Sequence, residues 1–298
     1  MILMKKTVIV EAPGKINLSF DITGKRTDGY HNVDTIMQTI DLCDTVTISR
    51  MDQKGIFISC DRPRIPCDET NFAHIAAQKF FAEFGQPDTG ISIDIQKRLP
   101  VQAGLAGGSA DAAAVLMGLN VFFDVNEDLF RLCRLGAEVG ADVPFCLMGG
   151  TQRATGIGER LAEVEELPRC QILIAKPPAG ISTKEAYARY DERGGENHPD
   201  IEYLLKQLRM DNLKDFSASM YNVLEEVAYL PEIPAIKRKM ISCGALGALM
   251  SGSGSAVFGI FDSRSLAKHC MRKLYDMSEA VFLARPAPHG AVVLDVRE

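Results

Sequence analysis

Apolar and polar residues alternate from Ile16 to Ile22, a pattern typical of a strand with one buried face. Short apolar segments of similar character predict further strands, which we place at 7–10, 33–40, 45–49, 56–60, 91–99, 171–175 and 280–285. A turn at 41–44 is expected to separate two of them. The segment 149–158 has the glycines of a hairpin, and 243–261 has the pattern strand, glycine turn, strand.

Apolar residues at helical spacing predict helices with a buried face over 71–84 and 129–139. An alanine-rich helix is expected to follow the glycines near residue 108, and the remaining helices are placed around Tyr187 and Tyr190 and at 201–208, 219–230 and 265–274. An exposed loop is expected at 191–199. The order of elements in the second half resembles a split βαβ sandwich. We therefore predict a boundary between about residues 161 and 168, with units 1–164 and 165–298.

Composition excludes several classes of protein. The net charge is −6, and lysines and arginines are spread along the chain, which argues against nucleic acid or an anionic membrane surface as the main partner. No apolar run reaches the roughly 18 residues of a membrane span, and residues 1–10 are expected to form a first strand rather than a targeting segment. The eight cysteines are scattered without a C-x-x-C pair, which predicts reduced core thiols in a cytoplasmic protein.

The segment 100–109 carries the first candidate chemistry, because its glycines precede the alanine-rich helix. Gly104, Gly107 and Gly108 permit positive φ and leave backbone N–H groups accessible. Ser109 is a natural N-cap, and Asp111 lies in the first turn, where the helix dipole favours a carboxylate. A helix N-terminus behind a glycine loop can bind phosphate, although an ordinary turn is an equally good interpretation. The sequence matches neither the Walker loop nor the G-x-G-x-x-G loop.

Four other residues, at three places in the chain, each allow two interpretations. Lys15 is either a solvated lysine or a cation directed at phosphate or at a hydroxyl that is being activated. Tyr30 and His31 could bind a ligand base or simply anchor a loop. Asp142 could be a catalytic carboxylate or, because Pro144 follows it, the start of a helix.

Considered together, three motifs resemble those of the GHMP small-molecule kinases. They are Ala-Pro-Gly-Lys-Ile-Asn-Leu at 12–18, the glycine segment at 99–110 and Leu-Met-Ser-Gly-Ser-Gly at 249–254. Gly-x-Arg-x-Asp-Gly-Tyr-His at 24–31 and Gly-Ala-Asp-Val-Pro at 140–144 resemble the members that act on 4-diphosphocytidyl-2-C-methyl-D-erythritol in the non-mevalonate isoprenoid pathway. The resemblance implies an α+β, two-domain fold: a ribosomal protein S5 domain 2-like N-terminal domain and a ferredoxin-like C-terminal domain, with the active site between them.

The resemblance also implies roles for individual residues. Asp142 would take a proton from the 2-hydroxyl of the methylerythritol unit, with Lys15 beside it. The residues expected to bind ATP are Asn71, Lys97, Pro100, Gly104, Leu105, Ala106, Gly107, Gly108 and Ser109. Those expected to bind the CDP-linked substrate are Asn17, Tyr30, His31, Tyr187, Gly252 and Gly254. Mg²⁺ would accompany ATP, with Ser109 as its protein contact.

The implied protein is a monomeric or homodimeric kinase. Two alternatives stay open: a sister kinase that acts on another small alcohol, and a catalytically silent nucleotide-binding paralogue. The sequence departs from the family pattern at Gly14, where alanine is usual, and at Ser255-Ala256, where Pro-Thr is common. The loop before Gly107 also contains fewer glycines than in some relatives.

Overall fold

A computed structural model describes residues 6–85 and 89–297; part of the expected first strand, residues 1–5, lies outside them. The strands are β1 (Thr7–Lys25), β2 (His31–Met51), β3 (Ile56–Cys60), β4 (Gly90–Gln96), β5 (Thr151–Gly156), β6 (Arg160–Glu163), β7 (Gln171–Lys176), β8 (Gly247–Met250), β9 (Val257–Phe261), β10 (Ala280–Ala284) and β11 (Val292–Arg297). The α-helices are α1 (Phe72–Phe84), α2 (Gly107–Phe122), α3 (Leu129–Ala137), α4 (Val143–Met148), α5 (Thr183–Arg193), α6 (Ile201–Arg209), α7 (Leu213–Ala218), α8 (Val223–Glu226), α9 (Glu232–Ser242) and α10 (Arg264–Leu274).

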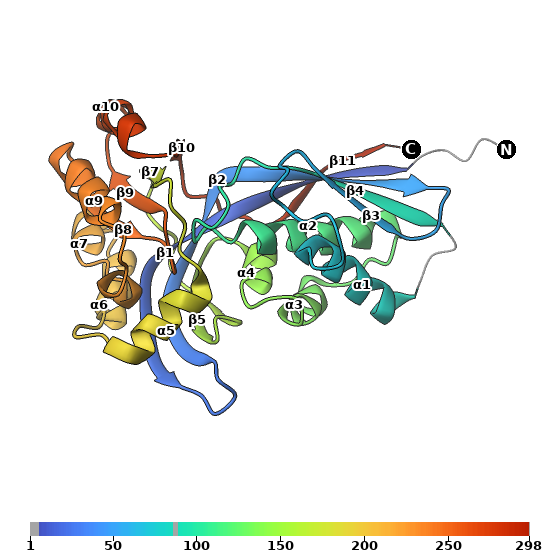
Figure 1. The fold of residues 1–298 in the computed structure, drawn as a ribbon, viewed down its shortest axis with the longest axis horizontal. Coiled ribbons are helices and arrows are strands. Elements are labelled where there is room, and N and C mark those ends of the chain that lie inside the picture. The colour runs from blue at the N-terminus through green and yellow to red at the C-terminus, as the bar shows by residue number, and fades with distance from the viewer. Residues whose placement is uncertain (1–5, 86–88, 298) are drawn as a thin grey trace.

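The first sheet has the strand order β11-β1-β2-β4-β3, and a β5-β6 hairpin joins the edge of β2. Two strands pair with the same edge of β2: β5 pairs with residues 33–38, and β4 pairs with residues 45–51. Helices α1 to α4 lie together beside this sheet (Figure 1). The strands β1 and β2 are long enough to extend beyond it toward α5, so the hairpin between them reaches the second half of the molecule.

The second sheet has the order β10-β7-β9-β8, and all its pairs are antiparallel. Helices α9 and α10 pack on it, which gives the βαββαβ arrangement of a ferredoxin-like sandwich. The last strand, β11, leaves this unit and pairs with β1 of the first sheet. The final residues of the expected second unit, 165–298, therefore pair with the sheet of the first unit.

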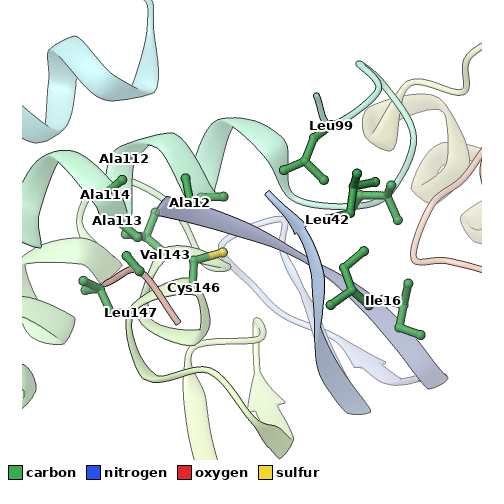
Figure 2. Packing of buried hydrophobic residues seen from close by; sticks show 14 of the residues in the cluster. Ala12, Ile16, Leu42, Leu99, Ala112, Ala113, Ala114, Val143, Cys146 and Leu147 are labelled. Atoms are coloured by element: carbon green, nitrogen blue, oxygen red, sulfur yellow. The ribbon is translucent and has the colours of Figure 1, made fainter. Parts of the chain in front are cut away.

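The core beneath the glycine segment depends on small side chains. Ala112, Ala113 and Ala114 on α2 are fully buried, and they lie among Ala12 and Val143 in Figure 2. Alanine lets a helix approach a sheet closely without a loss of helix propensity. The start of α2 is therefore held firmly against β1, the strand that carries Lys15.

The expected turn at 41–44 is wrong, because β2 continues through it. Ala12 pairs with Asp44 and Pro13 with Cys43, so β1 keeps this segment extended. The register of that pairing shifts between Pro13 and Lys15. A polar residue within a strand resembles a turn signal in the sequence, but here the carboxylate of Asp44 has buried partners, which are described below.

The expected helix at 219–230 is also wrong, since only α8 within it is helical. Asn222 caps α8 by accepting from the Leu224 N–H, and its amide group donates to the carbonyls of Met250 and Gly252. Asn222 therefore fixes the loop after β8 instead of continuing a helix. Similarly, β4 ends at Gln96, before the expected limit at residue 99, and α5 continues into the expected loop at 191–199.

All eight cysteines are unpaired thiols. Five of them are buried: Cys43, Cys146, Cys170, Cys243 and Cys270. Burial raises the pKa of the Cys133 thiol to about 11 and that of Cys170 to about 12, so these groups behave as small apolar side chains. Among the residues that the structure describes, no helix is both long enough and apolar enough to cross a membrane.

Candidate active site

A cleft of about 1220 Å³ brings together every site residue expected from the sequence. Its lining includes Lys15, Asn17, Tyr30, His31, Asn71, Lys97, Pro100, Gly104, Leu105, Ala106, Gly107, Gly108, Ser109, Asp142, Tyr187, Gly252 and Gly254. These residues come from both halves of the chain. Titratable groups that converge in a large cleft are the expected mark of an active site.

Two glycine-containing segments meet in this cleft, one from each half of the chain. The N–H groups of Ser255 and Ala256 donate to the carbonyls of Gln102 and Ala103, and the Ser251 hydroxyl donates to the Gly104 carbonyl at 2.9 Å. Gly104 has φ +74°, and a Cβ there would lie 2.0 Å from the Ser251 carbonyl oxygen. Glycine is therefore required at 104 by both its backbone conformation and this close approach.

The N-terminus of α2 opens into the cleft without a side-chain cap. The helix begins at Gly107, behind Ala106 in the left-handed conformation (φ 57°), so the expectation that Ser109 is the N-cap is wrong. Gly107 and Gly108 are the first helical residues and do not have positive φ, contrary to expectation. Within residues 6–85 and 89–297, the N–H groups of Gly107, Gly108 and Ser109 have no hydrogen-bond acceptor. They form a ready site for an anion.

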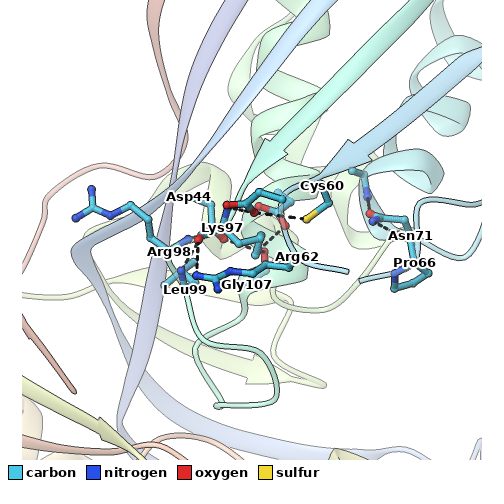
Figure 3. A network of polar contacts seen from close by, with 12 residues as sticks. Asp44, Cys60, Arg62, Pro66, Asn71, Lys97, Arg98, Leu99 and Gly107 are labelled. Atoms are coloured by element: carbon cyan, nitrogen blue, oxygen red, sulfur yellow. Dashed lines mark hydrogen bonds and ion pairs between the residues drawn. The ribbon is translucent and has the colours of Figure 1, made fainter. Parts of the chain in front are cut away.

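Lys97 lies directly below this helix start, and its ammonium group is occupied by protein groups. It forms ion pairs with Asp44 of β2 and with Asp111 of α2, the latter at 2.6 Å, and donates to the Gly107 carbonyl at 3.3 Å (Figure 3). The side chain is almost fully buried. Lys97 therefore joins β2, the end of β4 and the first turn of α2.

One ammonium group faces two buried carboxylates in this network. Burial lowers the pKa of Lys97, but Asp111 and Asp44 outweigh it, and the pKa rises above its usual value. Burial also raises the pKa of Asp111, to about 7, because it outweighs the attraction of Lys97. Asp44 accepts in addition from the N–H groups of Arg98 and Leu99 (Figure 3), whereas Oδ1 of Asp111 has no partner in the described part of the chain.

Lys15 and Asp142 form the ionic centre of the cleft. The ammonium nitrogen of Lys15 lies 3.5 Å from Oδ2 of Asp142 and donates to Oδ1 of Asn17 at 2.6 Å. The Asn17 amide group donates to the hydroxyl of Thr35 at 2.9 Å. Lys15 is buried, with 6% of its side chain exposed, whereas Asp142 is 35% exposed. The Asp142 carboxylate can therefore contact a ligand, while the buried ammonium group of Lys15 forms an ion pair with it.

Local structure explains why these two charges face each other. The register shift of β1 lies between Pro13 and Lys15, and the Lys15 N–H donates across the cleft floor to the Leu105 carbonyl at 3.1 Å. Asp142 occupies the N-cap position of α4, but its side chain makes no cap hydrogen bond. Asp142 therefore lies at the start of a helix, as the second interpretation predicts. Because its carboxylate caps no N–H group of that helix, it can face the cleft.

The tip of the β1-β2 hairpin contacts α5 through His31. The ring of His31 stacks on Tyr187, with centroids 4.9 Å apart and planes inclined by 28°. Nε2 of His31 lies 2.7 Å from Oδ1 of Asp191, whose Oδ2 pairs with Lys25 at 2.6 Å. Tyr30 is 60% exposed at the rim of the cleft. Sequence reasoning placed Asp191 in an exposed loop and missed its contact with His31.

Asn71 has a structural role in addition to its place in the cleft. Its Oδ1 accepts from the Ala73 N–H at 2.8 Å as the N-cap of α1, and its Nδ2 donates to the Pro66 carbonyl at 2.7 Å (Figure 3). Other lining residues were not expected, including Thr183 and Ser253, whose hydroxyl groups are 3.0 Å apart. No sequence motif marks Thr183, which is only the first residue of an ordinary helix.

Comparison with known proteins identifies the family of the chain. Residues 71–150 match the family described as "GHMP kinases N terminal domain", and residues 201–277 match "GHMP kinases C terminal". A protein of Bacillus pumilus (strain SAFR-032), named 4-diphosphocytidyl-2-C-methyl-D-erythritol kinase, is 43% identical over 280 residues, which cover 93% of this chain and 96% of that protein. The chain belongs to this family of GHMP kinases. The resemblance drawn from the sequence motifs is confirmed.

Solved structures of GHMP kinases agree on the fold. The crystal structure of a 4-(cytidine 5'-diphospho)-2C-methyl-D-erythritol kinase has a TM-score of 0.79 at 30% identity and covers 94% of this chain and 99% of its own. A homoserine kinase from Cytophaga hutchinsonii has a TM-score of 0.78 at 22% identity, covering 97% of both chains. The two TM-scores are almost equal, although the two kinases are named for different substrates. The fold therefore does not determine the substrate, and the residues that line the cleft must do so.

Proposed function

We propose that this GHMP kinase transfers the γ-phosphoryl group of ATP to the 2-hydroxyl of 4-diphosphocytidyl-2-C-methyl-D-erythritol. The observation that carries the proposal is the Lys15–Asp142 pair at 3.5 Å, placed in the same cleft as an uncapped helix N-terminus. The high identity to the Bacillus pumilus protein over nearly the whole chain supports the substrate. Phosphoryl transfer depends mainly on positioning and on neutralising charge, which these groups can supply.

Asp142 would act as the general base. Its partly exposed carboxylate can accept a hydrogen bond from the attacking hydroxyl and take up the proton as the phosphorus–oxygen bond forms. Lys15 would hold that carboxylate in place by their ion pair and stabilise the developing alkoxide. Asn17 would orient both the ammonium group and the substrate, because it is itself held by Thr35.

The N–H groups of the α2 N-terminus would receive the phosphates of ATP. Gly104, Leu105 and Ala106 would form the wall of that site, and Gly252 and Gly254 would close it from the other half of the molecule. Gly252 has φ +53°, and a Cβ there would meet the Asn17 carboxamide oxygen at 3.0 Å. Asn71 and Lys97 would lie on the adenosine side, and Pro100 would belong to the same ATP site. Lys97 would act there through the loop it holds, because protein groups already occupy its ammonium group.

Magnesium would neutralise the phosphate charge when it binds with ATP. Among the described residues, no three histidine, cysteine or acidic side chains cluster as a metal cage. Mg²⁺ often needs only one or two protein oxygens in addition to phosphates and water, and the cleft offers the Ser109 hydroxyl next to the helix N-terminus. The donor set therefore fits an ion that arrives with the nucleotide.

The test is ADP release with Mg-ATP and each of four alcohols: the CDP-linked methylerythritol, homoserine, mevalonate and galactose. We expect release with the CDP compound alone. Release with one of the others instead would make the chain a sister kinase. Silence with all four, together with measurable ATP binding, would leave a nucleotide-binding paralogue without this chemistry.

A further inference from the structure

His31, Asp191 and Lys25 form a chain of charge-assisted contacts at one end of the cleft. His31 begins β2, Lys25 ends β1, and Asp191 lies on α5. Oδ1 of Asp191 faces Nε2 of His31 at 2.7 Å, and Oδ2 faces the ammonium group of Lys25 at 2.6 Å. The two oxygens of a single carboxylate thus have separate partners. Removing Lys25 would leave the contact with His31 in place.

The carboxylate determines which nitrogen of His31 carries the proton. The hydrogen bond from Lys25, followed by that from His31, holds the pKa of Asp191 below its usual value, so Asp191 is ionised and only accepts hydrogen bonds. Nε2 must therefore be protonated to make its 2.7 Å contact. In the neutral ring, Nδ1 then carries a lone pair and acts as an acceptor. No group in the described part of the chain bonds to Nδ1.

Tyr187 restricts how the ring can turn. Its own ring stacks on His31 at 4.9 Å, and only 7% of the His31 side chain is exposed. A flip of the imidazole would remove Nε2 from Asp191. The stacked face of Tyr187 is also occupied by His31, so a ligand base must use its other face. His31 lines the cleft, and Nδ1 is the ring nitrogen that no protein group in the described part of the chain occupies.

We propose that Asp191 is a positioning residue that makes the cleft select cytosine over uracil by holding Nδ1 of His31 as a hydrogen-bond acceptor. This inference rests on the proposed function, because it concerns the base of the CDP-linked substrate. Cytosine carries an amino donor at C4, whereas uracil carries a carbonyl acceptor there. A fixed acceptor nitrogen can accept from the amino group of cytosine, but it cannot pair with the carbonyl oxygen of uracil. Buried polar groups that lack a partner penalise binding of the wrong ligand.

The test compares Asp191→Asn with the matched variant Lys25→Met. An asparagine has both a donor and an acceptor, so it supports either form of His31, whereas Lys25→Met removes the other partner of the same carboxylate. Rates of ADP release are measured at pH 8.5 with the CDP-linked methylerythritol and its UDP-linked analogue. In Asp191→Asn we expect the CDP-to-UDP ratio of kcat/KM to fall by about tenfold, through KM, with the KM for ATP within about twofold. In Lys25→Met the ratio stays as in the unmodified protein.

Equal losses for the two substrates in Asp191→Asn, or an unchanged ratio, would overturn the inference and show that Asp191 only supports the fold. Calorimetric binding of CDP and UDP separates this outcome from failure of the proposed function, because it needs no turnover. If the unmodified protein prefers CDP and Asp191→Asn loses that preference, while no methylerythritol compound is phosphorylated, the inference holds and the proposed reaction fails. Nitrogen-15 spectra of the His31 ring supply a further readout: we expect protonation at Nε2, and a mixture of forms in Asp191→Asn.

Discussion

The ammonium group of Lys15 and the carboxylate of Asp142 lie 3.5 Å apart, although β1 and α4 are distant in sequence. Because Asp142 is the base in the proposed reaction, Asp142→Asn is expected to lower kcat by about 10²–10⁴-fold. Binding of ATP and of the CDP-linked substrate is expected to change by less than about fivefold, since the side chain keeps its size. Steady-state ADP release and calorimetry with each ligand measure these quantities.

Asp41 offers a matched control for that substitution. Its side chain is 36% exposed and pairs with Arg285, whereas that of Asp142 is 35% exposed and pairs with Lys15. Asp41→Asn should leave kcat unchanged. Full activity in Asp142→Asn would exclude Asp142 as the base, and a similar loss in both variants would indicate a general effect on folding.

Lys15→Met tests the second member of the pair. The variant loses the charge next to Asp142 and the donor to Asn17, so we expect kcat to fall by about 10²-fold or more, as for the loss of one group that stabilises developing charge. Lys176 is equally buried, with 6% of its side chain exposed, but it pairs with Glu279. Lys176→Met should lower the melting temperature and leave kcat near that of the unmodified protein. Comparable losses of kcat in the two variants would argue against a specific role of Lys15.

Gly104→Ala tests the contact between the two glycine-containing segments. A Cβ at 104 would lie 2.0 Å from the Ser251 carbonyl oxygen, at φ +74°, so the segments must separate. We expect the KM for ATP to rise by about tenfold or more. Gly194 is a close control, because its φ is +71° and a Cβ there would meet no atom within 4 Å. Gly194→Ala should cost about 1 kcal/mol of stability from backbone strain and leave that KM unchanged. Similar KM values in both variants would show that the close approach at 104 is unimportant.

Local sequence signals predicted much of this architecture. The apolar spacing at 71–84 marks α1, and the glycine turn near residue 252 lies between β8 and β9, because each depends on neighbours in the chain. Strand β11 escaped prediction, since its pairing with β1 joins opposite ends of the chain and Val292, Leu294 and Val296 remain partly exposed. Helix α9 begins after Pro231 and contains another proline in its first turn, a signal that resembles a loop although helices tolerate it there.

The sequence predicted the residues of the site and the proximity of Lys15 to Asp142, but not the other contacts within it. Motif resemblance placed Lys15, Asp142 and His31 in one cleft, as the structure has them. It missed Asp44 and Asp191, because each acts through a partner that is remote in sequence. A residue that acts through a remote partner leaves no local pattern in the sequence. Asp44 therefore resembles a turn residue, and Asp191 resembles part of an exposed loop.

The pKa of Asp111 leads to a prediction for the pH dependence of stability. Burial raises it from 3.8 to about 7, so the folded protein holds this proton more tightly than the unfolded chain does. The stabilising contribution of Asp111 is therefore complete below about pH 4 and is lost as the pH rises to about 7. The Asp111→Asn variant has no titratable group at this position, so it does not lose this stability as the pH rises. Relative to the unmodified protein, the free energy of unfolding of the variant should rise between pH 4 and pH 8, by on the order of 2–4 kcal/mol.

Urea unfolding of both proteins across this pH range measures the difference. Groups remote from Asp111 titrate alike in the two proteins, so their contributions cancel in the difference. The remaining attraction of Lys97 to Asp44 is present in both, and the pKa of Lys97 lies above its usual value, outside the range examined. Curves that stay parallel from pH 4 to pH 8 would mean that Asp111 ionises as readily in the folded protein as in the unfolded chain. The Lys97 ammonium would then offset the burial of both carboxylates, and the network beneath the phosphate site would keep its charge throughout.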